Sequence, residues 1–367
     1  MKKLVIENFK SYKNPTEVGF SEITLNAGMN SVGKSTVTQS LLLLYQLQRL
    51  WLQYNSSSLT VNLNGFFDME LGQYKDVVSD PKLGIKICVD GKEFAFCESD
   101  NPFHMICNIV DEGVFPLFKE GFHYINAERI GPRNYHQLTE DLEELCGIHG
   151  EFTYEAMARN MLAIVDDRRL FRKPGNAVKT LPGQVEAWMS FIVPGIRFSA
   201  NESRENRIAS MRMRQVVMDM DLSSPYNFGF GISYILSIIV TCLMAKEGAT
   251  VVIENPEAHM HPAGQSHMGQ FLAQMAESGI NIIVETHSEH LINGVRLHAL
   301  KNGMTSDRIC INYFTLTGDG TEVQRIALSD DMNIKSWPKG FLDQEEIDML
   351  EMRRIRKQNA NKGHMEK

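Results

Sequence analysis

One glycine-bounded loop, GMNSVGKS at residues 28–35, constrains the fold more than any other segment of the chain. It matches the pattern G-x-x-x-x-G-K-[ST] at every fixed position. The apolar run EITLNAG comes before it, and KSTVTQSLLLLYQLQRLWLQ, which favours a helix, comes after it. A strand, a glycine loop and a helix in this order form a phosphate-binding loop, because backbone N–H groups and the positive end of the helix converge on one anion. The alternative is a glycine turn that precedes Lys-Ser by chance. Such a turn would not need a strand before it and a helix after it.

The side chains of this loop predict separate contacts with a nucleoside triphosphate and its metal ion. The glycines let backbone N–H groups turn toward phosphate oxygens. In such loops the lysine, here Lys34, reaches the β- and γ-phosphates, and the hydroxyl, here that of Ser35, binds Mg²⁺. The nucleotide-binding residues expected in this segment are Gly28, Asn30, Ser31, Gly33, Lys34, Ser35 and Thr36.

An acid stands at the end of a second apolar run, in VVIENPEAHMHP at residues 251–262. If the two strands are parallel neighbours, Glu254 lies beside the loop and binds Mg²⁺, directly or through water. The alternative is a buried acid that pairs with a lysine elsewhere. Asn255 cannot accept a proton, although its amide can orient a water molecule. Glu257 is the nearest carboxylate that could act as a base, and helix capping is an equal alternative for it.

A histidine follows the next buried strand, NIIVET. His287 should emerge at the edge of a parallel sheet where Glu254 ends its own strand, which is where open α/β folds bind ligands. It could hydrogen-bond the γ-phosphate or the attacking water, and helix capping is the alternative. The nearby His259, His261 and His290 lack a cysteine or further acid at the spacing of a zinc site.

The composition is that of a globular protein of 367 residues, 43% hydrophobic and 22% charged. Six cysteines without C-x-x-C spacing, and no signal peptide, indicate reduced thiols in a cytoplasmic protein. The run FGFGISYILSIIVTCLMA at 228–245 is short and interrupted for a membrane span, so we expect a core helix.

The net charge of −8 gives no overall attraction to nucleic acid, so such binding would need a local basic patch. Solvated helix faces explain most of the arginines equally well. The arginines that could form such a patch are Arg129, Arg133, Arg168, Arg169, Arg172, Arg204, Arg207, Arg212 and Arg214.

The pattern along the chain indicates one large domain, at residues 1–330, and a tail at 331–367. After the loop and its helix, alternating segments with Asp90-Gly91 as a hairpin turn predict an antiparallel β region. Residues of about 140–220 are expected to form an inserted helical subdomain. A β–α–β unit follows, with Pro262 opening its helix. The tail run DQEEIDMLEMRRIRKQ predicts a helix with acids first and bases last.

These motifs together resemble the ABC-type ATPases of the SMC, Rad50 and OLD-like group. LVIENFKSY is similar to their first strand, GMNSVGKST to their Walker A, IENPEAHMHP to their Walker B and D-loop, VETHSEHL to their switch histidine, and NFGFGISYIL to their signature motif. The resemblance implies an α/β P-loop fold of ABC-ATPase type with a mixed or parallel sheet. It also implies ATP and Mg²⁺ as cofactors.

The same resemblance implies a partner copy. Ser233, with Gly229 and Gly231, would contact the γ-phosphate of ATP bound by another protomer, which predicts a homodimer or a higher even oligomer. Gln73 would be the Q-loop residue. Asn255 stands where the group has its catalytic glutamate, so the chain could hydrolyse ATP slowly, use Glu257, or serve as a non-hydrolysing scaffold.

A narrower resemblance concerns YINAERIGPR at 124–133, Asn255 and the tail SWPKGFLDQ. These are similar to bacterial ATPases that carry a DUF3696-type C-terminal domain and have been linked to phage-defence loci. No nuclease domain or long coiled coil is expected in this chain. The resemblance therefore implies a separately encoded effector, a nuclease or a toxin, with DNA binding for repair as the alternative and no membrane partner.

Overall fold

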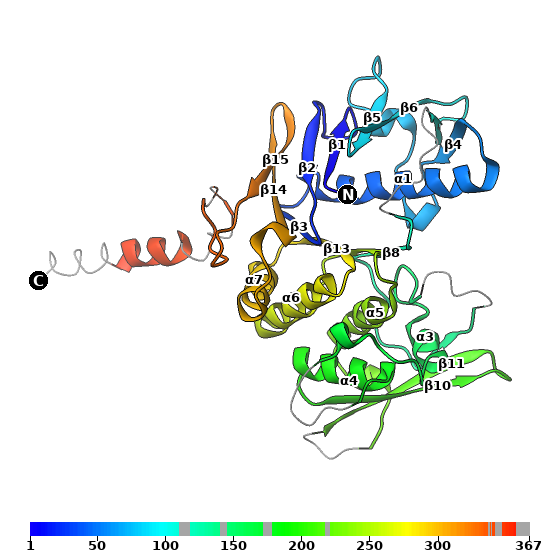
Figure 1. Ribbon diagram of the computed structural model, residues 1–367, viewed down its shortest axis with the longest axis vertical. Coiled ribbons are helices and arrows are strands. Elements are labelled where there is room, and N and C mark those ends of the chain that lie inside the picture. The colour runs from blue at the N-terminus through cyan, green and yellow to red at the C-terminus, as the bar shows by residue number, and fades with distance from the viewer. Residues whose placement is uncertain are drawn as a thin grey trace, which may run out of the picture.

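The computed structural model describes residues 1–109, 118–139, 145–171, 178–216, 221–336, 338, 340–341 and 347–356. They form stacked layers around a central sheet (Figure 1). The helix that follows the loop and a second sheet cover one face of the central sheet, and three helices cover the other. The loop thus lies between two layers of a large core.

The central sheet has the strand order β15-β14-β3-β13-β12-β8. Its strands are parallel, except that β15 runs antiparallel to β14. The central strands are almost continuously apolar, as parallel strands buried on both faces must be. Their bounds are β3 Ile23–Gly28, β8 Phe122–Ile125, β12 Thr250–Glu254, β13 Asn281–Thr286, β14 Ile309–Thr317 and β15 Gly320–Ile326.

Helix α1 (Lys34–Tyr54) packs between the central sheet and a wholly antiparallel sheet. Leu41, Leu42, Leu43 and Leu44 are all buried, because both sides of the helix face apolar layers. The predicted antiparallel region is present, and Asp90 and Gly91 join β5 to β6 with positive φ angles. Its elements are β1 Lys3–Glu7, β2 Thr16–Gly19, β4 Ser58–Asn62, η1 Phe66–Asp68, α2 Tyr74–Val77, β5 Ile85–Val89, β6 Lys92–Glu98 and β7 His104–Asn108.

Helices α5 (Phe230–Met244), α6 (Pro262–Glu277) and α7 (Glu289–Asn302) cover the other face. Most of α5 is buried, so the apolar run predicted as a core helix is one. Among the described residues, no helix is both long and apolar enough to cross a membrane.

The outermost layer is a three-stranded antiparallel sheet, β10-β11-β9, against helices α3 (Thr153–Arg159) and α4 (Leu181–Ile192) (Figure 1). The prediction that residues of about 140–220 are helical was therefore wrong in part. IRFSANES and IASMRMRQ alternate with a period of two, and their apolar residues face the helices. The strands are β9 Tyr135–Gln137, β10 Ile196–Ser203 and β11 Ile208–Gln215, and η3 (Asp167–Arg169) and η5 (Pro225–Asn227) are short turns.

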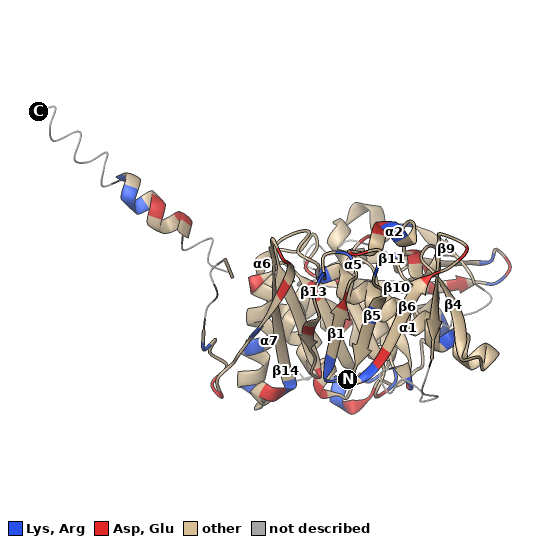
Figure 2. Ribbon diagram, turned by 90° about the horizontal axis from the view of Figure 1, so that it is seen from above, with Lys and Arg blue, Asp and Glu red and all other residues tan. Residues whose placement is uncertain are grey.

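The C-terminal segment leaves the body of the protein. Met332, Ile334 and Phe341 are still buried in the main core. Residues 347–356 are helical and exposed, and they lie apart from the layers (Figure 2). In this helix Asp348 comes early and Arg356 late, in the order expected for the helix dipole. Trp337, residues 342–346 and residues 357–367 lie outside the described residues.

Candidate nucleotide-binding site

A row of polar residues crosses four neighbouring strands of the central sheet. Asn312, Asn26, Glu285 and Glu254 are in register on β14, β3, β13 and β12. Nδ2 of Asn312 donates a hydrogen bond of 2.9 Å to Oδ1 of Asn26, and both amides are buried. The two acids continue this row on the side where α1 begins. The sheet therefore brings two carboxylates to the phosphate-binding loop.

The strand order corrects one expectation. Strand β12, which carries Glu254, is not the neighbour of β3, because β13 lies between them. After β12 the chain forms α6 and then β13, and β13 pairs with both β3 and β12. Glu285 therefore stands next to the loop strand, and Glu254 is one strand further away. Glu285 is not among the residues predicted from the sequence, although an acid inside a buried strand, two residues before His287, was a signal.

The backbone of residues 28–35 requires its glycines. Gly28 has a φ of 152°, and a Cβ there would lie 2.6 Å from the carbonyl oxygen of Phe314. Gly33 has a φ of 102°, and a Cβ there would lie 2.6 Å from Oγ1 of Thr321. Thr321 also donates to the carbonyl of Val32, at 2.9 Å. These close contacts hold the loop against β14 and β15, with the N-terminus of α1 directly after it.

The side chains of Lys34 and Ser35 form hydrogen bonds with other groups of the protein. Nζ of Lys34 donates to the carbonyl oxygens of Gly28 (3.1 Å) and Met29 (2.5 Å). Burial lowers the pKa of Lys34, while Glu285 and Glu257 oppose this effect. Oγ of Ser35 donates to Oε1 of Glu285 at 2.9 Å. Both side chains thus have partners that phosphate and metal ligands could replace.

Asn30, Ser31 and Thr36 complete the predicted loop residues. Ser31 has a positive φ of 61°, which helps the loop to turn. Thr36 is buried, and its N–H donates to the carbonyl of Gly33 at 3.2 Å. Asn30 is exposed at the surface of the loop.

The two acids of the polar row have different surroundings. Burial raises the pKa of Glu285 to about 7, the charge of Glu254 adds to the rise, and Lys34 and Ser35 oppose it. Its Oε2 is buried and has no hydrogen-bond partner among the described residues. Burial also raises the pKa of Glu254, but the hydroxyl of Tyr124, the N–H of Ala127 and the charge of Arg129 counteract this.

Asn255 is held by its backbone. Its φ is 45°, and its N–H donates to the carbonyl of Glu285 at 2.8 Å. The guanidinium of Arg129, only 4% exposed, donates to the carbonyls of Glu254 and Asn255, at 2.7 Å each, and lies 5.1 Å from the ring centre of Tyr234. Oδ1 of Asn255 is buried without a partner in the described part of the chain. An amide oxygen is therefore left to accept a hydrogen bond.

Burial removes two arginines from the predicted basic patch. Arg129 braces the turn after β12, as described above. Arg169 is also buried and donates to the carbonyl groups of Leu243 and Ala245 at the end of α5. Both guanidinium groups satisfy backbone carbonyls inside the protein, so neither can face nucleic acid. Arg172 lies outside the described residues.

Glu257 and His287 lie together beside the loop. Oε1 of Glu257 accepts the backbone N–H of His287 at 2.7 Å, and Oε2 is buried and unpartnered among the described residues. Burial and the charge of Lys34 lower the pKa of His287, and Glu257 and the backbone of Gly28 oppose this. Helix capping falls to other residues, because His261 caps α6 and Ser288 caps α7.

The other residues implied by the resemblance are not gathered at the loop. Gly229 is the N-cap of α5, and a Cβ on Gly231 would lie 2.6 Å from the carbonyl of His259. The hydroxyl oxygen of Ser233 is buried beside Tyr154. The N–H of Gln73 donates to Asp76 at the start of α2, and no hydrogen bond among the described residues joins Gln73 to the loop.

The chemistry of the site suits a magnesium nucleotide. Mg²⁺ prefers oxygen ligands and usually keeps phosphate oxygens and waters in addition to one or two protein groups. The Ser35 hydroxyl and the unpartnered oxygen of Glu285 are such groups. In the described part of the chain, no three His, Cys, Asp or Glu side chains are arranged to hold a metal by themselves. A cation here would therefore depend on phosphate oxygens.

The profile of the AAA ATPase domain family matches residues 1–108 and 184–292, which is more than half of the chain. The chain belongs to this family. Residues 304–352 match a second family, described as a protein of unknown function (DUF3696). No curated protein matches the chain.

Two solved structures of Smc heads share the fold. One, the SmcHead bound to the C-winged helix domain of ScpA, has a TM-score of 0.53 and 13% identity, with 91% of this chain and 99% of that chain covered. The other, a Smc head domain with an extended coiled coil bound to the C-terminal domain of ScpA derived from Pyrococcus furiosus, has a TM-score of 0.50 and 12% identity, with 96% and 99% covered. The chain therefore has the α/β P-loop fold of an Smc head, in agreement with the fold predicted from the sequence.

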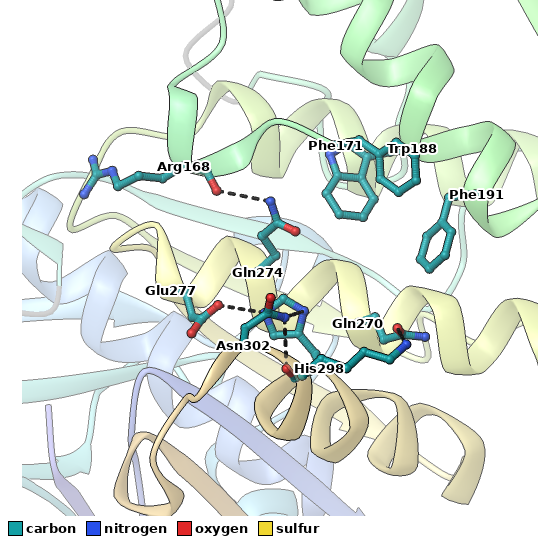
Figure 3. A pocket seen from close by; sticks show the side chains of 10 residues that line it. Arg168, Phe171, Trp188, Phe191, Gln270, Gln274, Glu277, His298 and Asn302 are labelled. Carbon is teal, nitrogen blue, oxygen red and sulfur yellow. Dashed lines mark hydrogen bonds and ion pairs between the residues drawn. The ribbon is translucent and has the colours of Figure 1, made fainter. Parts of the chain in front are cut away.

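A separate cavity of about 560 Å³ lies between α4, α6 and α7 (Figure 3). Phe171, Trp188 and Phe191 form one wall. Gln270 and His298, among other polar side chains, form the opposite wall. None of its lining residues belongs to the nucleotide-binding site.

Proposed function

We propose that this protein binds Mg·ATP at residues 28–36, hydrolyses it slowly, and uses its nucleotide state to regulate a separately encoded nuclease or toxin in bacterial anti-phage defence. The observation that carries the nucleotide proposal is the set of hydrogen bonds made by the side chains of Lys34 and Ser35. Lys34 donates to carbonyl oxygens of the loop and Ser35 donates to Glu285, and phosphate and Mg²⁺ can replace these protein partners. Lys34 would move from the loop carbonyls to the β- and γ-phosphates.

The hydrolytic step would use Glu257. When bound, Mg²⁺ would withdraw charge from the γ-phosphate. The water oxygen would form a bond to the γ-phosphorus while the bond to the bridging β–γ oxygen breaks, and the water proton would go to Glu257. Oε2 of Glu257 and Oδ1 of Asn255 are buried acceptors without partners among the described residues, so both can bind that water. Because Asn255 cannot take the proton, we expect a slow reaction.

We propose that two copies pair head to tail across the nucleotide. The N-terminus of α5, at Gly229 and Phe230, would face the loop of the partner, and the ring of Phe230 is 58% exposed. Met29, in the loop, is 72% exposed. Because the Ser233 hydroxyl is buried, the backbone N–H groups at the start of α5 would make the first contact with the γ-phosphate.

Equilibrium binding and phosphate release test this proposal. Wild type should bind ATP, and Lys34→Ala should weaken binding. Turnover that Glu257→Gln abolishes would support hydrolysis. If wild type binds ATP but releases no phosphate, alone or with its genomic neighbours, the protein is a non-hydrolysing scaffold. A protein that binds no ATP, or a Lys34→Ala variant with unchanged affinity, would remove the proposal.

A second candidate function, nucleic-acid binding, is favoured by the outer face of the β10-β11-β9 sheet. Arg197 and Arg214 are directly opposite each other, and Arg212 is one outward position further along β11. Glu186 and Asp221 line the same pocket as these three arginines, but no ion pair joins them among the described residues. The remaining outward residues include no acid: Ser199, Asn201, Ser203, Ile208, Ser210, Tyr135 and Gln137. Arginine, serine and asparagine side chains are the usual partners of nucleic-acid phosphates.

This candidate predicts salt-dependent binding to duplex DNA. The double variant Arg197→Gln/Arg214→Gln should weaken binding and reduce the salt slope by about 2, since each lost phosphate contact removes about 0.9. The matched control is Arg168→Gln/Arg204→Gln, whose arginines are exposed but paired with acids. If no binding is detected at low salt, or if both double variants behave alike, this candidate is wrong.

A further inference from the structure

The cavity between α4, α6 and α7 lies outside the proposed ATP site, and its lining is arranged to hold a ligand of its own (Figure 3). We propose that it binds a purine nucleoside monophosphate. The cavity volume of about 560 Å³ is within the range of about 300–1,000 Å³ that is usual for small-molecule sites. Aromatic, amide and cationic side chains line the cavity, and each kind suits one part of such a molecule.

The aromatic wall is held in place before any ligand arrives. The ring centre of Trp188 lies 4.9 Å from that of Phe171 and 6.0 Å from that of Phe191. Nε1 of Trp188 donates to the carbonyl of Arg169 at 3.0 Å, which fixes the orientation of the indole. The ring of Phe191 also stacks on that of His267, with 4.1 Å between the ring centres. Phe171 and Phe191 are only half-buried, so their rings keep surface on which a flat base can stack.

Two glutamines one turn apart on α6 lie across the cavity from these rings (Figure 3). Nε2 of Gln274 donates to the carbonyls of Arg168 (3.2 Å) and Leu170 (2.9 Å), which leaves its Oε1 as an acceptor. Oε1 of Gln270 accepts from Nζ of Lys301 at 3.2 Å, which leaves its Nε2 as a donor. Neither remaining atom is among the fully buried ones, so a ligand in the cavity can reach both. A purine edge offers a donor beside an acceptor, which matches this pair.

Lys301 supplies the positive charge for a phosphate group. Among the described residues, its Nζ has only the amide oxygen of Gln270 as a partner. Other charged side chains of the lining already have partners, because Arg168 forms ion pairs with two acids and Oε2 of Glu277 lies 2.7 Å from Nε2 of His298. Lys301 can therefore make a charge-assisted hydrogen bond to an anionic group. A longer phosphate chain would bring more negative charge to a lining that includes Glu277, so one phosphate fits better.

The place of the cavity on α6 and α7 allows its ligand to be studied apart from ATP. Both helices begin close after residues of the proposed ATP site, Glu257 and His287. The cavity is lined instead by the C-terminal halves of the two helices, from Gln270 on α6 and from His298 on α7. Substitutions in the lining therefore leave the phosphate-binding loop unchanged.

Fluorescence of Trp188 in the full-length chain tests the proposal. The parent protein is Trp51→Phe/Trp337→Phe, in which Trp188 is the remaining tryptophan, combined with Lys34→Ala to weaken binding at the phosphate-binding loop. AMP and GMP are titrated, with adenosine and ribose 5-phosphate as partial ligands. We expect a saturable change with AMP or GMP and none with ribose 5-phosphate, because the base provides the stacking. Adenosine should bind about 5- to 10-fold more weakly than AMP, since it lacks the charge-assisted contact.

Two variants of the lining make the result decisive. Lys301→Gln should reduce the advantage of AMP over adenosine to about onefold, and Gln270→Leu should weaken both about 3- to 10-fold. The matched control is Lys75→Gln, which removes an exposed lysine on α2 and should change neither affinity. The proposal is overturned if neither AMP nor GMP changes the fluorescence at millimolar concentration, or if ribose 5-phosphate binds as well as AMP. It is equally lost if Lys301→Gln keeps the full advantage of AMP.

Discussion

Replacement of Glu285 by glutamine should stabilise the protein in the absence of nucleotide and metal. Burial raises the pKa of this carboxyl from 4.5 to about 7. Between these two pH values, the folded protein keeps a proton on Glu285 that the unfolded chain releases. One pKa unit corresponds to about 1.4 kcal/mol, and the ionised carboxylate therefore destabilises the fold by about 3 kcal/mol at pH 8. Glutamine carries no charge, and its Oε1 can still accept the Ser35 hydroxyl.

The sign of the pH dependence follows from the same comparison. Between pH 4.5 and 7 the folded state binds more protons than the unfolded state, so wild type loses stability as the pH rises through this window. Glu285→Gln has no such loss. The advantage of the variant should therefore be close to zero at pH 4.5, grow through the window, and reach its full value above pH 7.

Urea unfolding in EDTA between pH 4.5 and 8 measures this advantage. Glu70→Gln is the matched control, since it removes the same charge from an exposed carboxylate and should change stability by less than about 0.5 kcal/mol. The reasoning is refuted if Glu285→Gln gains nothing at pH 8, or if its gain is the same at pH 4.5. A gain with the expected pH profile would mean that the ionised carboxylate of Glu285 destabilises the protein without ligands. A bound cation could then offset this destabilisation.

Three further outcomes are expected. Lys34→Ala should weaken ATP binding about 10- to 100-fold in equilibrium titrations, because a charge-assisted contact is worth about 1.5–3 kcal/mol. Arg129→Met should lower the free energy of unfolding by about 2–4 kcal/mol, since it leaves buried carbonyls unpaired, whereas the exposed Arg133→Met should change it by less than about 0.5 kcal/mol in the same urea series. Asn255→Glu should increase phosphate release about 10-fold or more by adding a second base, and an unchanged rate would indicate that proton transfer does not limit turnover.

Local patterns were sufficient for much of the nucleotide-binding site. The match at residues 28–35 depends only on the spacing of glycine, lysine and serine within eight consecutive residues. The loop and the helix after it could therefore be located from the amino-acid sequence alone. Glu257 and His287 could be expected near each other, because the carboxyl ends of parallel strands meet at one edge. The apolar core helix at 230–244 was equally predictable from its length and its flanking residues.

Short patterns were enough to find the phosphate-binding turn, the helix after it and the apolar strands around it, because these depend on neighbours within a few residues. The order of the strands emerged only from the folded chain: β13 lies between β3 and β12, which brings Glu285 rather than Glu254 to Ser35. The burial of Arg129 under the turn at Asn255 likewise has no counterpart in a short sequence pattern. Strand order and burial arise from contacts between residues far apart in the chain, and no short pattern carries that information.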